Sequence, residues 1–507
     1  MDEAQGSFAT RFQAALARNG LRLTPEEEAS LLKLAGWMHA GLESLKGSGQ
    51  DAPETSVLDL SIPQIGQRLR AGTLTARELT KATLARIAER DGTYLSFYRV
   101  LADSALAEAD RADAELASGL DRGPLHGIPV GIKDLIDFAG VPTTANAPGR
   151  ANAVARKDAL VVERLREAGA IIIGKLATYE WATVGPDKRG LFPPARNPWN
   201  LDHITGGSSS GCAAAVAGGL VRTSIGTDTG GSLRGPSFYC GTVGLKPTFG
   251  LVPTEGVLDL APSLDHVGPI SATVEEAAIT LDVLAGRSGV DSVASALGQS
   301  IAGLRIGYAR DWFAHDPQVM PEVVAAMDQA VSTLSSLGAV VSEVPMSDYP
   351  AIEVAVAAIL HAESFRLHAD NLRNHPESYG RGAFLSLAAG LAVSDTDLAA
   401  ARAEGRRFRA EVDALLDRHD VLVTVGALTT ALHAALFEKE PVWTPMRTIG
   451  FNVSGHPVLA LPIGFHDGLP IGMQIVGRHH AEARILQIGH AFEEATDVGL
   501  QKPPQPA

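Results

Sequence analysis

Hydrophobic residues alternate along the chain between helical spacing and short continuous runs. Apolar positions at the 3.6-residue period of an amphipathic helix predict helices over residues 75–89, 104–116 and 158–168. Short apolar runs bounded by turn residues predict strands over residues 127–133, 170–174, 421–424, 457–463 and 472–476. Because helices and strands alternate, we expect a layered α/β fold.

The first 45 residues predict a small helical extension made of two helices. The second begins at Thr24-Pro25-Glu26-Glu27, which combines a capping box with proline at the first helical position. Residues 46–56 have the composition of a flexible linker, and residues 57–507 follow as the main domain. The apolar face of the second helix consists of Leu31, Leu34, Trp37, Met38 and Leu45. Exposing this face would be costly, so we expect it to cover its own protomer or a second copy, and we favour a homodimer.

The charge and cysteine content argue against several classes of protein. The 507 residues include 43 basic and 58 acidic side chains, and the net charge of −15 argues against nucleic acid or an anionic membrane surface as the main partner. Cys212 and Cys240 are too few for a disulfide framework and lie in an apolar segment, as small buried residues do. The N-terminus lacks the apolar core of a signal peptide, and no run approaches the roughly 20 apolar residues of a membrane helix. We therefore expect a soluble cytoplasmic protein.

Candidate chemistry is concentrated between residues 206 and 248, which read GGSSSGCAAAVAGGLVRTSIGTDTGGSLRGPSFYCGTVGLKPT. Two glycine-serine turns, 206–208 and 230–232, flank a short apolar helix. Glycines beside serine let backbone N–H groups approach a reacting atom, because no Cβ blocks them. Upstream, Lys133 lies in an apolar run, where burial would favour its neutral form, and a neutral lysine can act as a base. We infer a Lys-Ser-Ser site for acyl transfer.

At these residues the chain resembles the amidase signature enzymes. It matches the family pattern GGSSxG followed by TDxGGSxRxPxxxCGxxGLKPT almost letter for letter, and the resemblance extends from about residue 57 to about residue 494. The resemblance implies a single large mixed β-sheet covered by helices on both faces, with residues 57–507 as the catalytic domain. It also implies that Lys133 is the base, Ser208 the bridging serine after a cis peptide bond, and Ser232 the nucleophile that forms an acyl-enzyme. The implied substrate is a small-molecule amide, and an ester or carbamate would suit the same site.

The segment around Ser232 supplies further candidate groups. The backbone N–H groups of Thr229, Gly230 and Gly231 are candidate donors to the oxyanion that forms during amide hydrolysis. By resemblance, Asp228 and Arg234 hold the shape of this loop and take no part in proton transfer.

Other residues are expected to support the site or to line its pocket. Ser209 and Ser210 lie at the start of the apolar helix as caps or hydrogen-bond donors, and we expect Ser210 to support Lys133. His479-His480 has no partner at the spacing of a zinc site and is expected at the surface, so we expect neither a metal nor an organic cofactor. The expected pocket wall consists of Thr178, Trp443 and Phe451.

Three other interpretations remain open. Residues 207–211 also fit G-x-S-x-G, the nucleophile elbow of α/β hydrolases, which would make Ser209 the nucleophile. That elbow needs a preceding strand, whereas the polar sequence NPWNLDHIT precedes it here. The chain could also be the A subunit of the glutaminyl-tRNA amidotransferase, which shares this signature and works in a complex. The N-terminal extension favours a stand-alone hydrolase instead. A binding module without catalysis would leave the lysine and the two serines without a role.

Overall fold

The computed structural model describes residues 24, 25, 27, 29–33, 35, 56–439 and 442–505. The chain divides into two units, residues 1–56 and residues 57–507, which are considered separately. In the first unit, the Thr24 N–H donates to the Glu27 carboxylate (2.8 Å) and the Glu27 N–H donates to Thr24 Oγ1 (3.3 Å), which confirms the predicted capping box. Leu31 of the predicted apolar face is exposed. Leu34, Trp37, Met38 and Leu45 lie outside the described residues, as does nearly all of the predicted linker, so their roles stay predictions.

The second unit is built on one eleven-stranded mixed sheet, as expected from the resemblance. Strand β2 is parallel to both of its neighbours, and β7 is likewise parallel to β8 and β9, whereas the other pairs are antiparallel. The strands, in their order across the sheet, are β1 (Phe97–Val100), β3 (Ile171–Leu176), β2 (Pro129–Lys133), β4 (Thr223–Asp228), β6 (His266–Ser271), β5 (Val243–Lys246), β10 (Val458–His466), β11 (Leu469–Val476), β9 (Val421–Val425), β7 (Arg305–Tyr308) and β8 (Val340–Glu343).

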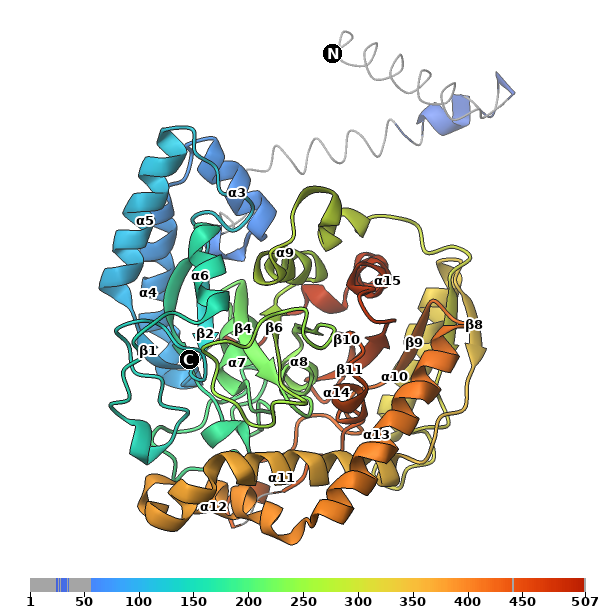
Figure 1. Cartoon of the computed structure of the whole chain (residues 1–507). Helices are drawn as coiled ribbons and strands as arrows, with labels where there is room; N and C mark the ends of the chain where they lie inside the picture. The colour runs from blue at the N-terminus through green and yellow to red at the C-terminus, as the bar shows by residue number, and fades with distance from the viewer. Residues whose placement is uncertain are drawn as a thin grey trace. The chain divides into compact units, whose positions relative to one another are not determined.

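Helices cover both faces of this sheet (Figure 1). They are α3 (Ile62–Arg70), α4 (Ala76–Tyr94), α5 (Ala102–Ala117), α6 (Leu160–Glu167), α7 (Ser210–Ala217), α8 (Arg234–Cys240), α9 (Val274–Ala285), α10 (Pro321–Ser336), α11 (Tyr349–Asn374), α12 (Arg381–Ala388), α13 (Asp395–Leu416), α14 (Gly450–Ser454) and α15 (Glu482–Glu494). Successive side chains of β10 show the two layers, because neighbours on a strand point to opposite faces. Leu459 packs against Gly489 of α15, whereas Ala460 clusters with Phe238 of α8.

The predicted elements agree with the structure to within a few residues, apart from the longer C-terminal end of α4. The helices predicted at 75–89, 104–116 and 158–168 correspond to α4, α5 and α6, and the predicted strands correspond to β2, β3, β9, β10 and β11. Thr75 caps α4 through a capping box with Glu78, which explains why this helix begins at Ala76. Among the described residues no single helix is long and apolar enough to span a membrane, although the bent pair 381–392 and 395–416 passes the same test of length and composition when joined.

Candidate active site

The parallel pairing of β2 and β4 brings the candidate base to the same edge of the sheet as the loop of the candidate nucleophile, residues 229–232, called the nucleophile loop. Ile132 of β2 pairs with Ile225 of β4, so the carboxyl ends of the two strands lie side by side. Lys133 is the last residue of β2 and is fully buried. Its Nζ lies 2.8 Å from Ser208 Oγ and 2.8 Å from Thr227 Oγ1, and Thr227 is the penultimate residue of β4.

Within the described part of the chain, no carboxylate is bonded to the Lys133 amine. Burial lowers the pKa of Lys133 from 10.5 to about 7, and the more distant Asp228 and Asp265 only partly oppose this effect. The neighbouring Asp134 does not pair with Lys133, because its carboxylate lies 3.3 Å from Lys175 Nζ and also accepts hydrogen bonds from Thr144. At neutral pH a large fraction of Lys133 is therefore uncharged and has a lone pair available for a proton.

The three consecutive serines have different partners. The Gly207–Ser208 peptide bond is cis, as expected from the resemblance. Ser209 Oγ donates to the carbonyl oxygen of Thr227 (3.0 Å), and Ser209 makes no side-chain cap. Ser210 Oγ donates to the carbonyl oxygen of Ala177 (3.3 Å), so the hydrogen bond that we expected from Ser210 to the lysine is not made, and Thr227 supplies that second partner instead.

The elbow interpretation of Ser209 lacks its structural requirement. Residues 197–207, all of them described, form turns and irregular segments with no strand immediately before the serines. Ser209 is also fully buried and does not line the cavity whose wall includes Ser232. A nucleophile must reach its substrate, so Ser209 is not suited to this role.

The loop from Thr229 to Ser232 follows β4 and leads into α8. Ser232 is half-buried, and the Ser209 N–H donates to its carbonyl oxygen (3.3 Å), which joins the two glycine-serine turns. Gly231 has φ +128°, and a Cβ there would collide with the Thr448 side chain, so this position requires glycine. The Gly231 N–H donates to Asp228 Oδ1 (2.7 Å) and is therefore not free to bind an oxyanion, contrary to our expectation. In this described loop, the N–H groups of Thr229, Gly230 and Ser232 have no protein partner.

A buried ion pair fixes the shape of this loop. The Asp228 carboxylate accepts hydrogen bonds from the Leu233 N–H and from Nε and Nη2 of Arg234, both of which lie 3.0 Å from the carboxylate. Burial alone would raise the pKa of Asp228, but the Arg234 guanidinium and the Asn452 amide hold it well below its usual range. Arg234 also donates to the Thr448 carbonyl oxygen and to Gln474 Oε1, so every side of the guanidinium is engaged.

We expect Arg234→Met to lower the free energy of unfolding by about 3–5 kcal/mol, because it leaves the fully buried Asp228 without its partner. The matched control is Arg366→Met, which removes an exposed pair with Asp395 and should change stability by less than about 1 kcal/mol. Chemical denaturation of both variants measures the difference. Equal stability of the two variants would contradict this account of the loop.

A cavity of about 130 Å³ opens beside the nucleophile loop. Its wall includes Ser232, the three residues before it, and Trp443, which was expected there. Thr178 is buried and bonds to backbone groups, so its neighbour Tyr179 lines the cavity in its place. Phe451 does not line the cavity, because it packs in the core against Trp312. Wall residues that the sequence did not indicate include Glu353, His361, Ser386, Met446 and Thr448.

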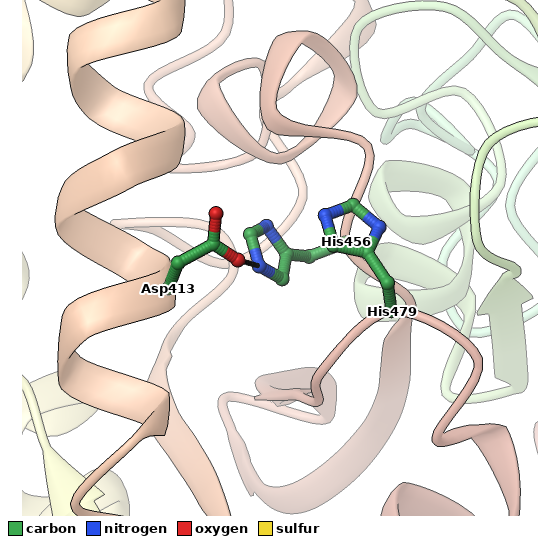
Figure 2. Close-up of side chains that lie close together, drawn as sticks. All are labelled: Asp413, His456 and His479. Carbon is green, nitrogen blue, oxygen red and sulfur yellow. Dashed lines mark hydrogen bonds and ion pairs between the residues drawn. The ribbon is translucent and has the colours of Figure 1, made fainter.

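Outside this cavity, three side chains that could ligate a metal lie together (Figure 2). Asp413 lies on α13, His456 just before β10 and His479 just after β11, and their ligand atoms fall within 4.8 Å of one another. His479 is half-buried beside these two residues, contrary to our expectation of a surface pair. His480 is exposed, as expected. Burial, with help from His479 and Lys246, lowers the pKa of His456 to about 2, so its neutral ring donates to Asp413.

The side chains of this cluster already contact one another. The centroids of the two imidazole rings lie 4.1 Å apart and the ring planes are tilted by 35°. Asp413 Oδ1 already lies 3.0 Å from His456 Nε2. We therefore assign no metal to the cluster.

We expect dialysis against a chelator to leave hydrolytic activity unchanged, because the base, the bridging serine and the N–H donors are all parts of the chain. Assays before and after dialysis test this. If dialysis lowers the activity, zinc restores it, and zinc no longer restores it in His479→Ala, the cluster of Figure 2 holds a functional ion.

Comparison with known proteins shows the family to which the chain belongs. The Amidase family model matches residues 78–486. The A subunit of glutamyl-tRNA(Gln) amidotransferase from Moorella thermoacetica is 34% identical over 479 residues, which cover 88% of this chain and 98% of that protein. The solved structure of native peptide amidase from Stenotrophomonas maltophilia is 30% identical with a TM-score of 0.76, covering 90% of this chain and 99% of that one. An inhibitor-bound structure, described as a vestigial protein complex that reveals the origins of an s-triazine catabolic enzyme, is 32% identical with a TM-score of 0.79, covering 86% and 98%. The chain belongs to the amidase signature family.

Proposed function

We propose that this protein hydrolyses the C–N bond of a carboxamide through a covalent acyl-enzyme on Ser232. The observation that carries the proposal is the 2.8 Å contact between Lys133 Nζ and Ser208 Oγ, next to a loop that places Ser232 in the wall of a cavity. Neutral Lys133 can keep donating to Thr227 while it accepts the proton of Ser208, because an amine has one lone pair and two N–H bonds. These groups supply a base, a relay and a nucleophile within one chain.

In the proposed reaction, Ser232 Oγ attacks the amide carbon while its proton passes to Ser208, and the Ser208 proton passes to Lys133. The free N–H groups of Thr229, Gly230 and Ser232 are suited to stabilise the oxyanion that forms. When the C–N bond breaks, the proton returns from Lys133 through Ser208 to the departing nitrogen. Water then attacks the acyl ester by the same relay, which releases the acid and restores Ser232.

The first candidate is a stand-alone hydrolase of small-molecule amides. Its support is that all groups needed for the proposed chemistry lie within residues 57–507. Peptide amidase, one of the solved structures that the chain resembles, carries a name of this kind. Esters and carbamates share the tetrahedral intermediate, so they would be processed at the same site if the cavity admits them.

The second candidate is the amidase component of a tRNA-dependent amidotransferase. Its support is the name of several relatives, each the A subunit of a glutamyl-tRNA(Gln) amidotransferase, at 34% to 36% identity over most of the chain. These relatives favour this candidate over a stand-alone amidase. In that case the amide would be the source of ammonia, and the protein would assemble with other subunits rather than as the homodimer that we favoured from the N-terminal helices.

Assay of the purified chain alone separates the two candidates. Ammonia or amine release is measured with glutamine, with simple aliphatic and aromatic amides, and with matching esters. A stand-alone hydrolase should turn over amides other than glutamine without added subunits. Activity with glutamine only, and only after further subunits and tRNA are added, would favour the second candidate.

A further inference from the structure

The wall of the cavity has an unusual distribution of charge. Among its described residues, Glu353 is the single carboxylate, and no lysine or arginine contributes to the wall. His361 also lines the cavity, and burial lowers its pKa, which favours the neutral ring. The ionised side chain that a bound substrate would meet is therefore negative.

Glu353 is held in place by the cavity wall itself. It lies on α11, and its Oε1 accepts a hydrogen bond from the indole N–H of Trp443 (2.8 Å). Its second oxygen, Oε2, has no hydrogen-bond or ion-pair partner among the residues that the structure describes. Trp443 is itself 57% exposed and lines the same cavity. The wall thus offers an oriented carboxylate with a free oxygen next to an accessible aromatic ring.

This combination selects for the charge of a ligand. A carboxylate binds an ammonium or guanidinium group through charge-assisted hydrogen bonds, and an indole ring attracts the same cations. A carboxylate group on the ligand would be repelled by Glu353 and would find no cation in the described wall. Free glutamine carries both groups: its α-ammonium would suit Glu353, but its α-carboxylate would find no cation in the described wall, so an amide with a cation and no carboxylate suits this wall better.

We propose that the substrate is an amide that carries a cationic nitrogen and no carboxylate, and that Glu353 with Trp443 binds this cation in the cavity beside Ser232. The proposal rests on the proposed function, because it names the substrate class of the same site. Glu353 determines specificity, whereas the transfer of protons stays with Lys133 and the two serines.

The test uses the full chain and three amides of equal length. They share one scissile bond and differ at the far end, which carries an ammonium, a neutral hydroxyl or a carboxylate. We expect kcat/KM for the ammonium amide to exceed that for the hydroxyl amide by about 10- to 100-fold, and the carboxylate amide to be the poorest. Glu353→Gln keeps the acceptor for Trp443 but removes the charge, and should reduce this preference to within about threefold through loss of activity with the ammonium amide.

The matched control is Asp370→Asn, which makes the same change of charge on an exposed residue of α11 outside the cavity. It should keep the wild-type preference. Equal kcat/KM for the ammonium and hydroxyl amides in the wild type, or an unchanged preference in Glu353→Gln, would overturn the proposal.

A second measurement covers the case in which no amide of the panel is hydrolysed. The rate of covalent labelling of Ser232 by a sulfonyl fluoride is measured with butylammonium or butanol as competitor. Protection by butylammonium alone, lost in Glu353→Gln, supports the cation site, whereas equal effects of the two competitors overturn it. If Ser232 is not labelled at all, the proposed function fails and this inference fails with it. Hydrolysis of neutral amides without any preference for the cation overturns the inference alone.

Discussion

Ser232→Ala should lower kcat by at least about 10,000-fold, the largest effect that we expect from a single substitution. The reason is that the variant removes the atom that attacks the amide, and the remaining groups cannot form an acyl-enzyme. Ser232 lies in the wall of the cavity and its side chain makes no hydrogen bond that the fold requires, so the variant should fold normally. Steady-state hydrolysis of the best amide of the panel gives the measurement.

The matched control for this variant is Ser335→Ala, on an exposed position of α10 far along the chain from the site. It should retain wild-type turnover. Ser232→Ala with more than about one tenth of wild-type kcat, at unchanged thermal stability, would place the nucleophile elsewhere.

The second large effect concerns Lys133. Replacement by methionine keeps the length of the buried side chain and removes its amine, so we expect the fold to persist and kcat/KM to fall by about 100- to 10,000-fold, the usual contribution of a general base. In the wild type, burial lowers the pKa of Lys133 to about 7. Below that pH the amine is protonated and cannot accept a proton, so kcat/KM should rise with pH through about 7 and then level off.

The pH profile separates catalysis from structure. Lys133→Met should lose the rise near pH 7 together with the rate, whereas Lys81→Met, on the exposed side of α4, should keep both. A profile with the same rise in Lys133→Met would assign the titration to another group and remove the lysine from the mechanism.

The sequence predicted several elements with a strong apolar pattern and missed others, some with such a pattern, as in α3, and some without one. Strand β4 is a clear case: its sequence TSIGTD is mostly small and polar, yet all six residues are buried, because β2 and β6 pair with its edges and α7 and α9 pack against it. Burial here comes from tertiary position, which hydrophobic periodicity cannot reveal. The missed strand matters, because it places Thr227 within hydrogen-bond distance of Lys133 and is followed by the nucleophile loop.

The candidate site likewise contains some residues that the sequence indicated and others that only tertiary contacts bring to it. The proximity of Lys133 and Ser208 was expected from the resemblance, which assigns them as base and bridging serine although 75 residues separate them. Glu353 was missed because it lies in α11, distant in sequence from the motif, and no local pattern distinguishes it from other helix carboxylates. Thr178 and Phe451 were misplaced because a residue one or two positions from a cavity residue, here Tyr179 or Ile449, can point into the core instead.

The histidines show a further limit of predicting a side-chain cluster from the spacing of residues in the sequence alone. His479 had no partner at zinc-like spacing, yet α13 and the segment before β10 bring Asp413 and His456 to it (Figure 2). Three residues from three elements form such a cluster only through the fold.

Covalent labelling is the most direct test of the central claim, that Ser232 is the nucleophile of a Lys-Ser-Ser site. The protein is treated with a sulfonyl fluoride, digested, and the modified residue is located by mass spectrometry. The account predicts one label on Ser232, with labelling slowed at least tenfold in Lys133→Met because the base no longer activates the hydroxyl. A label on Ser208 or Ser209 in the wild type, or labelling of Ser232 at an unchanged rate without Lys133, would contradict it.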